Sequence, residues 1–197
     1  MTFVEGTTPY PWPWDGGLDP ARLALLVVAC PLHPGRERPT DADHPAETLA
    51  AAVRRAGGRV LSVGVRPPIQ MSVRPRPRPV APGTDDPVLH PGRLIRAAGW
   101  DGFHGSRLDA VLRGAQRDLL LIAGCCLETG VHSTMRAAND RGYECLLVTD
   151  ACTSAEPDLT AAALSTIEMS GGIFGAVGDS GAVVEALHTL MTERTTS

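Results

Sequence analysis

Two cysteines and a glutamate follow a buried strand near the middle of the chain. Leu119 to Ala123 is a continuous apolar run of strand length, and Gly124 permits a sharp turn after it. Cys125, Cys126 and Glu128 lie on that turn. A thiolate is a nucleophile, so the two cysteines are candidates for covalent chemistry, whereas buried cysteines are usually inert. Glu128 is expected to stabilise the start of the following helix.

A second group of candidate residues surrounds Phe103. Asp101 and His104 flank it, and together they could act as a general acid pair. The same residue types are also ordinary in surface loops, where they carry no catalytic role. Both interpretations of Asp101 and His104 therefore stay open.

The elements that position the turn form one βαβ unit. From Glu128 onward the apolar residues change to helical spacing, and Gly142 stops the helix. Cys145 to Val148 is a second buried run, so two parallel strands flank one crossover helix. In such sheets, ligands collect outside the carboxyl ends of the strands. We therefore expect any chemistry between Gly124 and Val131.

The remaining pattern alternates strands and helices. We expect further strands at Leu23–Val28, at Arg59–Val65 and within Gly171–Val177. We expect helices at Ala46–Ala56, Arg107–Ala115, Pro157–Met169 and Val183–Met191. Ser106 is the expected N-cap of the helix Arg107–Ala115. The strands are apolar on both faces, as in the centre of a parallel sheet. The fold class is therefore α/β: a three-layer, doubly wound, mostly parallel sheet with helices on both faces.

Length and composition limit the class of protein. The 197 residues are expected to form one domain, with a Pro/Trp-rich arm at 1–20 and a Pro/Arg-rich loop at 66–91. The formal net charge of −4 gives no reason to expect a nucleic-acid or membrane partner. Neither a spanning segment nor a leader is evident, and we expect a cytoplasmic protein.

Metals and cofactors are not expected. The five cysteines lack metal-binding spacing, and the Asp and His residues of the loop 31–45 lie among prolines without rigid spacing. All 18 basic residues are arginines, so no mechanism here uses a lysine.

The central unit resembles the isochorismatase-like cysteine hydrolases, and among them most closely the biuret amidohydrolases. The family pattern is a strand, then G-x-x-T-x-x-C-V, then a helix ending in R-x-A-x-D-R-G-Y. The residues that fall on it here are Gly124, Val131, Arg136, Ala138, Asp140, Arg141, Gly142 and Tyr143. The resemblance covers nearly the whole chain and implies the family's fold.

The same resemblance implies that the family's catalytic groups are missing. In working members a cysteine attacks a carbonyl carbon, an aspartate takes its proton and a lysine holds charge in place. Gly130 falls on the cysteine, Ala29 on the aspartate and Ala97 on the lysine. The resemblance also implies a ligand pocket of Cys30, Trp100, Phe103, Cys125, Cys126, Leu127 and Gly130. The candidate substitutes for the lost groups are Asp101, His104, Glu128 and Cys126.

Two hypotheses follow. The first is a pseudoenzyme that keeps the hydrolase scaffold and acts by binding a small ligand or a partner subunit. The resemblance implies an oligomer, as a homodimer or homotetramer or with an active paralogue. The second is a repurposed enzyme, in specialised metabolism for example, that acts on a small carbonyl or enol substrate through residues such as Asp101, His104 and Glu128.

Overall fold

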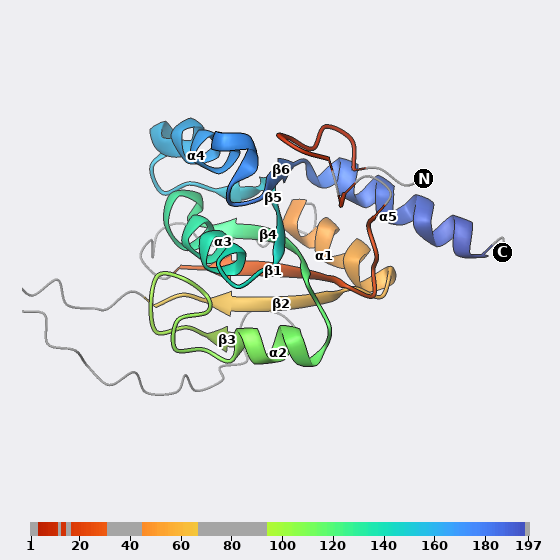
Figure 1. Cartoon of the computed structure of the whole chain (residues 1–197), viewed down its shortest axis with the longest axis horizontal. Coiled ribbons are helices and arrows are strands. Elements are labelled where there is room, and N and C mark those ends of the chain that lie inside the picture. The colour runs from red at the N-terminus through yellow and green to blue at the C-terminus, as the bar shows by residue number, and fades with distance from the viewer. Residues whose placement is uncertain (1–3, 12, 15–16, 31–44, 67–93, 196–197) are drawn as a thin grey trace, which may run out of the picture.

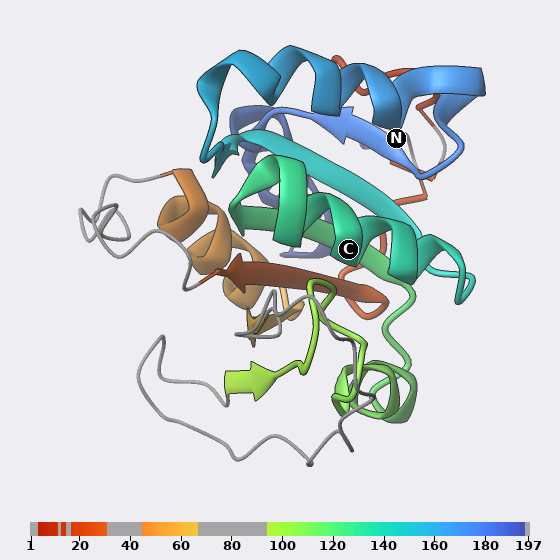
Figure 2. The same ribbon diagram turned by 90° about the vertical axis from the view of Figure 1, so that its left-hand side faces the viewer.

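A six-stranded parallel sheet forms the centre of the molecule. The computed structural model describes residues 4–11, 13–14, 17–30, 45–66 and 94–195. In that part of the chain the sheet order is β3-β2-β1-β4-β5-β6. The strands are β1 (Leu23–Ala29), β2 (Arg59–Gly64), β3 (Leu94–Arg96), β4 (Leu119–Cys125), β5 (Glu144–Thr153) and β6 (Ala176–Gly178). Figure 2 shows them succeeding one another from β6 at the top to β3 at the bottom.

Helices cover both faces of this sheet, as the sequence predicts (Figure 1). They are α1 (Pro45–Arg55), α2 (Leu108–Gly114), α3 (His132–Asn139), α4 (Thr160–Gly172) and α5 (Ser180–Thr195), with a π-helical turn η1 (Leu127–Val131) before α3 and a 3₁₀ turn η2 (Pro157–Leu159) before α4. Helices α1 and α5 pack in one core cluster, and α2, α3 and α4 pack in the other. The fold is therefore the predicted three-layer α/β arrangement.

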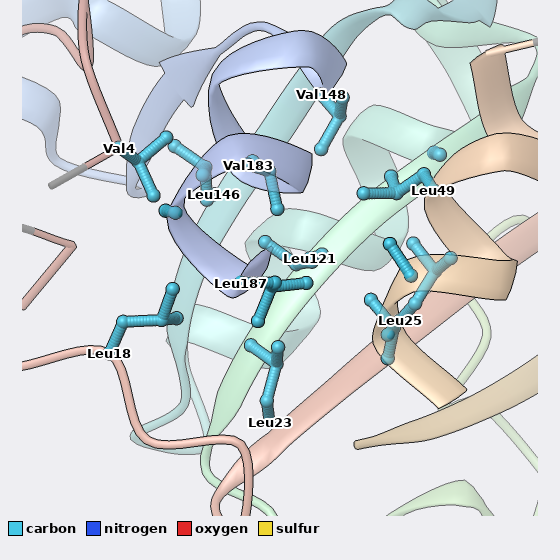
Figure 3. Packing of buried hydrophobic residues seen from close by; sticks show 14 of the residues in the cluster. Val4, Leu18, Leu23, Leu25, Leu49, Leu121, Leu146, Val148, Val183 and Leu187 are labelled. Atoms are coloured by element: carbon cyan, nitrogen blue, oxygen red, sulfur yellow. The ribbon is translucent and has the colours of Figure 1, made fainter. Parts of the chain in front are cut away.

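The alternation of side chains along the strands divides the core in two. In β1, Leu23 and Leu25 belong to the cluster beneath α1 and α5, whereas Leu26 and Val28 belong to the cluster beneath α2, α3 and α4. Figure 3 shows the first cluster, where Leu121 of β4 lies among side chains of β1, β5, α1 and α5. Burial on both faces explains why the strands are continuous apolar runs.

The N-terminal arm packs on the domain. Trp14 is fully buried in the cluster beneath α1 and α5. Thr8 pairs with Val177 at the free edge of β6, which extends the sheet by one antiparallel bridge. The hydroxyl of Tyr10 donates a 2.6 Å hydrogen bond to Glu144 Oε1, and burial raises the pKa of the Glu144 carboxyl. The arm therefore covers a sheet edge that would otherwise present unpaired backbone groups.

Several predicted boundaries were wrong in detail. Strand β5 runs on to Thr153, beyond the predicted run Cys145–Val148. Residues 171–175 are not strand, because α4 and a turn of left-handed glycines occupy them and β6 begins only at Ala176. The three-residue strand β3 was missed, because a run this short carries little periodicity. The N-cap of α2 is Arg107 and not Ser106 as predicted, because the helix begins one residue later, and the Ser106 hydroxyl accepts the N–H of Leu108 at 3.1 Å from outside the cap position.

Two predicted features lie outside the described residues: the loop 31–45, apart from Pro45, and the Pro/Arg-rich loop 66–91, apart from Arg66. Within the described part of the chain, no helix combines the length and the apolar character needed to cross a membrane.

Gly124 lets β4 approach β1 very closely. Its φ is +120°, and a Cβ added there would lie 2.0 Å from the carbonyl oxygen of Val28. Any side chain at this position would therefore collide with backbone that the sheet itself fixes. The contact lies where the strand order reverses, between β1 and β4, which is the place where open α/β sheets bind ligands.

We expect Gly124→Ala to lower the free energy of unfolding by more than about 4 kcal/mol, because the new methyl group meets immovable backbone. Gly142→Ala is the matched control, since Gly142 also has positive φ (+81°) but nothing lies within 4 Å of its added Cβ. We expect the control to cost about 1–2 kcal/mol from backbone strain alone. Urea denaturation of both variants measures the difference, and equal losses would contradict the close-contact explanation.

Candidate active site

The candidate site lies at the carboxyl ends of β1 and β4. Ala29 is the last residue of β1 and Cys125 the last of β4. Cys126 continues in extended conformation, and η1 then begins at Leu127. The predicted turn Gly124–Val131 therefore occupies the crevice at the point where the strand order reverses, as expected.

The structure brings Ala29, Ala97 and Gly130 together around one residue, Val65. The Val65 N–H donates to the Ala29 carbonyl at 2.9 Å. Ala97 follows β3 beside it, with its N–H bonded to the Gly64 carbonyl at 2.8 Å. A Cβ added to Gly130 would lie 2.9 Å from Val65 Cγ2. Three positions distant in sequence thus lie around Val65, at the carboxyl ends of the strands.

The surroundings of Gly130 are apolar. Besides Val65, the nearest atoms to an added Cβ are Val28 Cγ1 at 3.5 Å and the Cys125 carbonyl oxygen at 3.7 Å. Val28 and Val65 are both almost completely buried. A side chain at the position that the resemblance matches to a nucleophile would therefore overlap Val65 and make an ordinary van der Waals contact with Val28.

Thr134 links this turn to the loop before α2. Its buried hydroxyl donates to the Gly130 carbonyl at 2.6 Å and accepts the N–H of Gly102 at 2.9 Å. Sequence reasoning missed both Val65 and Thr134. A polar residue one turn into the helix after Gly130 was the available signal for Thr134, whereas an ordinary strand-end valine gives none.

The Cys126 thiol is a poor nucleophile. Burial, followed by the neighbouring Cys125, Cys30 and Glu128, raises the pKa of the Cys126 thiol to about 12. Burial similarly raises the pKa of Cys152 to about 12. Because the thiolate is the reactive form, Cys126 is almost entirely in its unreactive protonated form near neutral pH.

Glu128 lies in the first turn after Cys126, where the sequence predicts it. Its Oε1 accepts the backbone N–H of Glu156 at 2.8 Å, which ties the turn to the segment before α4. Its Oε2 is buried and has no hydrogen-bond partner in the described structure. Glu128 therefore keeps one free acceptor at the site.

Asp101 is committed to its own loop. Its Oδ1 accepts the N–H groups of Phe103 and His104, each at 2.8 Å, in a side-chain-capped turn. His104 is exposed, and the backbone carbonyl of His104 accepts the Ala98 N–H at 2.8 Å. These contacts give Asp101 a structural role, and its proposed part in acid catalysis stays a prediction.

The predicted pocket residues lie in three places. Cys30, Cys125 and Cys126 lie at the strand ends, near Gly130. Leu127 and Phe103 belong to the core cluster beneath α2, α3 and α4, against which Cys30 also packs, and the Phe103 ring stacks on Tyr143 with centroids 5.7 Å apart. Trp100 is 39% exposed on the loop after Ala97. The described residues contain no group of three or more Cys, His, Asp or Glu side chains placed to hold a metal.

Known proteins share this architecture. The chain is similar to a cysteine hydrolase from Pseudomonas syringae pv. phaseolicola, with 19% identity and a TM-score of 0.64 over 87% of this chain and 95% of that chain. It is similar to an isochorismatase family protein from Burkholderia thailandensis, with 23% identity and a TM-score of 0.65 over 87% and 97%. A nicotinamidase from Bacillus subtilis matches with 20% identity and a TM-score of 0.58 over 80% and 99%.

These likenesses show the fold, and a match over most of the sequence shows the family. Residues 34–180 match the Isochorismatase domain, which includes the turn at Gly124–Val131 and the strands on both sides of it. The chain belongs to the isochorismatase family.

Proposed function

We propose that this family member is a pseudoenzyme, which acts by binding and not by thiol-dependent hydrolysis. The observation that carries the proposal is the apolar packing at Gly130. Two valine methyl groups lie 2.9 and 3.5 Å from where its Cβ would be. Glycine supplies no nucleophilic atom, and a side chain in its place would overlap Val65.

The neighbouring positions support the same conclusion. By the resemblance to the biuret amidohydrolases, Ala29 replaces the proton acceptor and Ala97 the charged group of working members. Both alanines lie beside Val65, next to Gly130. A methyl group cannot accept a proton or stabilise a developing charge.

Cys126 does not replace the missing nucleophile. With a pKa of about 12, Cys126 is ionised in roughly one molecule in 10⁵ at neutral pH. Glu128 is among the groups that raise this pKa, so its carboxylate opposes ionisation of the thiol. This pairing lacks the activated thiolate that nucleophilic catalysis requires.

The proposed partner is either a small ligand at the candidate active site or another subunit. With another subunit, the protein would form a homodimer, a homotetramer or a hetero-oligomer with an active paralogue. Three large apolar side chains are exposed on and beside α4: Leu159 (47%), Met169 (50%) and Ile173 (52%). A second subunit that covered them would remove apolar surface from water. Under the proposal this binding protein acts in the cytoplasm.

One observation favours the repurposed enzyme as a second candidate. Glu128 Oε2 is buried without a partner, beside the turn that carries Gly130. A buried carboxyl with a free oxygen could hydrogen-bond a substrate and exchange a proton with it. Under this candidate the substrate is a small carbonyl or enol compound.

The first test is an assay of the purified chain with biuret, urea, nicotinamide and isochorismate. We expect no turnover above the uncatalysed rate, because loss of triad members costs several orders of magnitude. The Bacillus subtilis nicotinamidase serves as the positive control for nicotinamide.

Turnover that disappears in Cys125→Ser or Cys126→Ser would overturn the pseudoenzyme. Turnover that survives both changes and falls at least tenfold in Glu128→Gln would select the second candidate.

A second test probes the space at position 130. We expect Gly130→Cys to lower the free energy of unfolding by about 1–3 kcal/mol, because the new side chain overlaps Val65. Val65→Ala in the same chain should recover part of this loss, with a coupling of at least about 0.5 kcal/mol in a double-mutant cycle.

Gly114→Cys is the matched control, since nothing lies within 4 Å of a Cβ added there. It should leave stability unchanged or slightly raised, because glycine is a poor helix former. Additive effects of Gly130→Cys and Val65→Ala would show that Val65 does not fill the site.

A further inference from the structure

Helix α4 differs from the other helices in its exposed face. It lies at the outer end of the molecule, at the top of Figure 2, beyond β5 and β6. Each of the other helices in the described chain exposes at least one charged side chain, such as Arg54 on α1, Arg113 on α2, Arg136 on α3 and Glu185 on α5. Among these described helices, α4 alone exposes none. Its one charged residue, Glu168, is half-buried and accepts the Thr8 hydroxyl at 2.5 Å.

The exposed face of α4 has large apolar side chains at its two ends and small ones between them. Leu159 lies just before the helix and Met169 near its far end, and both are about half exposed. Ala162 and Ser165 lie exposed between them. These four residues recur every three or four positions, so they share one side of the helix. A helix that is apolar on its outer side as well as its inner side is normally buried, which suggests that another molecule covers α4.

This face is complementary to a second copy of itself. Met169 follows Leu159 by ten residues, which is about 15 Å along a helix. If two α4 helices lie antiparallel about a two-fold axis near Leu164, Leu159 of each copy meets Met169 of the other. Ala162 and Ser165 then lie at the crossing, where small side chains let the helix axes come close. The opposite partial charges of the two helix ends also become neighbours.

The charged residues at the two ends of α4 are opposite in sign. Glu156 lies exposed before the N-terminal end. Arg136 lies exposed beside the other end, with its guanidinium carbon 4.4 Å from the centroid of the Phe174 ring. Within the described chain, neither Glu156 nor Arg136 forms an ion pair. In the antiparallel arrangement, Glu156 falls opposite Gly172 of the other copy, near Phe174 and Arg136 of that copy. The two-fold axis would form this ion pair twice.

We propose that two copies of this chain associate through α4, antiparallel about a two-fold axis. This inference rests on the proposed binding role and names one partner, a second copy of the chain. The same residues form both sides of the contact, as a two-fold axis requires. The contact would also touch the candidate site, because the Glu156 N–H donates to Glu128 Oε1 at 2.8 Å. Glu128 lies in the turn that carries Gly130.

Sedimentation equilibrium of the intact chain measures the association. We expect a dimer with twice the 20.7 kDa mass of one chain. Ala162→Glu places two carboxylates near the axis, so it should raise the Kd of the dimer at least about tenfold. Ala51→Glu is the matched control, since Ala51 is also an exposed alanine in the middle of a helix, α1, and it should leave the Kd unchanged.

Charge reversal tests the antiparallel orientation. Glu156→Arg and Arg136→Glu should each raise the Kd of the dimer about threefold or more, because each places like charges together at both ends of the contact. The two changes combined should restore the Kd, because the exchanged charges pair again. A double variant that dimerises no better than the single variants would overturn this arrangement.

Circular dichroism checks that Ala162→Glu folds, and Met169→Lys replaces it if it does not. A monomeric unaltered chain, or a dimer that withstands the change in α4, would overturn the proposed contact. Either result would leave the pseudoenzyme proposal standing, with a small ligand as its partner. Turnover in the hydrolase assay would instead overturn the pseudoenzyme and leave the α4 contact standing.

Discussion

The contact between Gly124 and Val28 is the constraint on which the site depends. With φ of +120° and no side chain, Gly124 lets the β4 backbone lie against β1, where an added Cβ would be 2.0 Å from a carbonyl oxygen. The chain leaves β4 from this point, so the direction of η1 and the position of Gly130 follow from it. The candidate active site thus depends on one close backbone approach.

The scaffold around the turn is well connected, although its centre is apolar. Helix α3 is held at its start by the Thr134 hydroxyl on the Gly130 carbonyl. Further along, the Arg136 guanidinium lies 4.4 Å from the Phe174 ring centroid, and the His132 ring meets the same ring edge-on. These contacts hold the helix, and they do not depend on any reacting group. Selection for the fold can therefore persist where the hydrolytic reaction is absent, which is consistent with the proposed binding role.

Burial gives the cysteines of this protein their individual chemistry. Cys145 is completely buried in β5, and burial raises the pKa of its thiol. Cys126 is also buried, but its position at a strand end gives it a second thiol as neighbour. A protonated thiol is a poor nucleophile. The burial of Cys126 and Cys145 thus opposes thiol chemistry at both positions.

Local sequence pattern was sufficient for the fold, because parallel strands buried on both faces must be apolar runs and glycines must stand where the backbone turns sharply. It therefore predicted β1, β2, β4 and the turn at Gly124, but not the three-residue β3 or the exact start of β6. The site depended on which strand ends become neighbours in space. The contact of Val65 with Gly130 arises only when β2, β1 and β4 lie side by side, since it joins residues far apart in the chain.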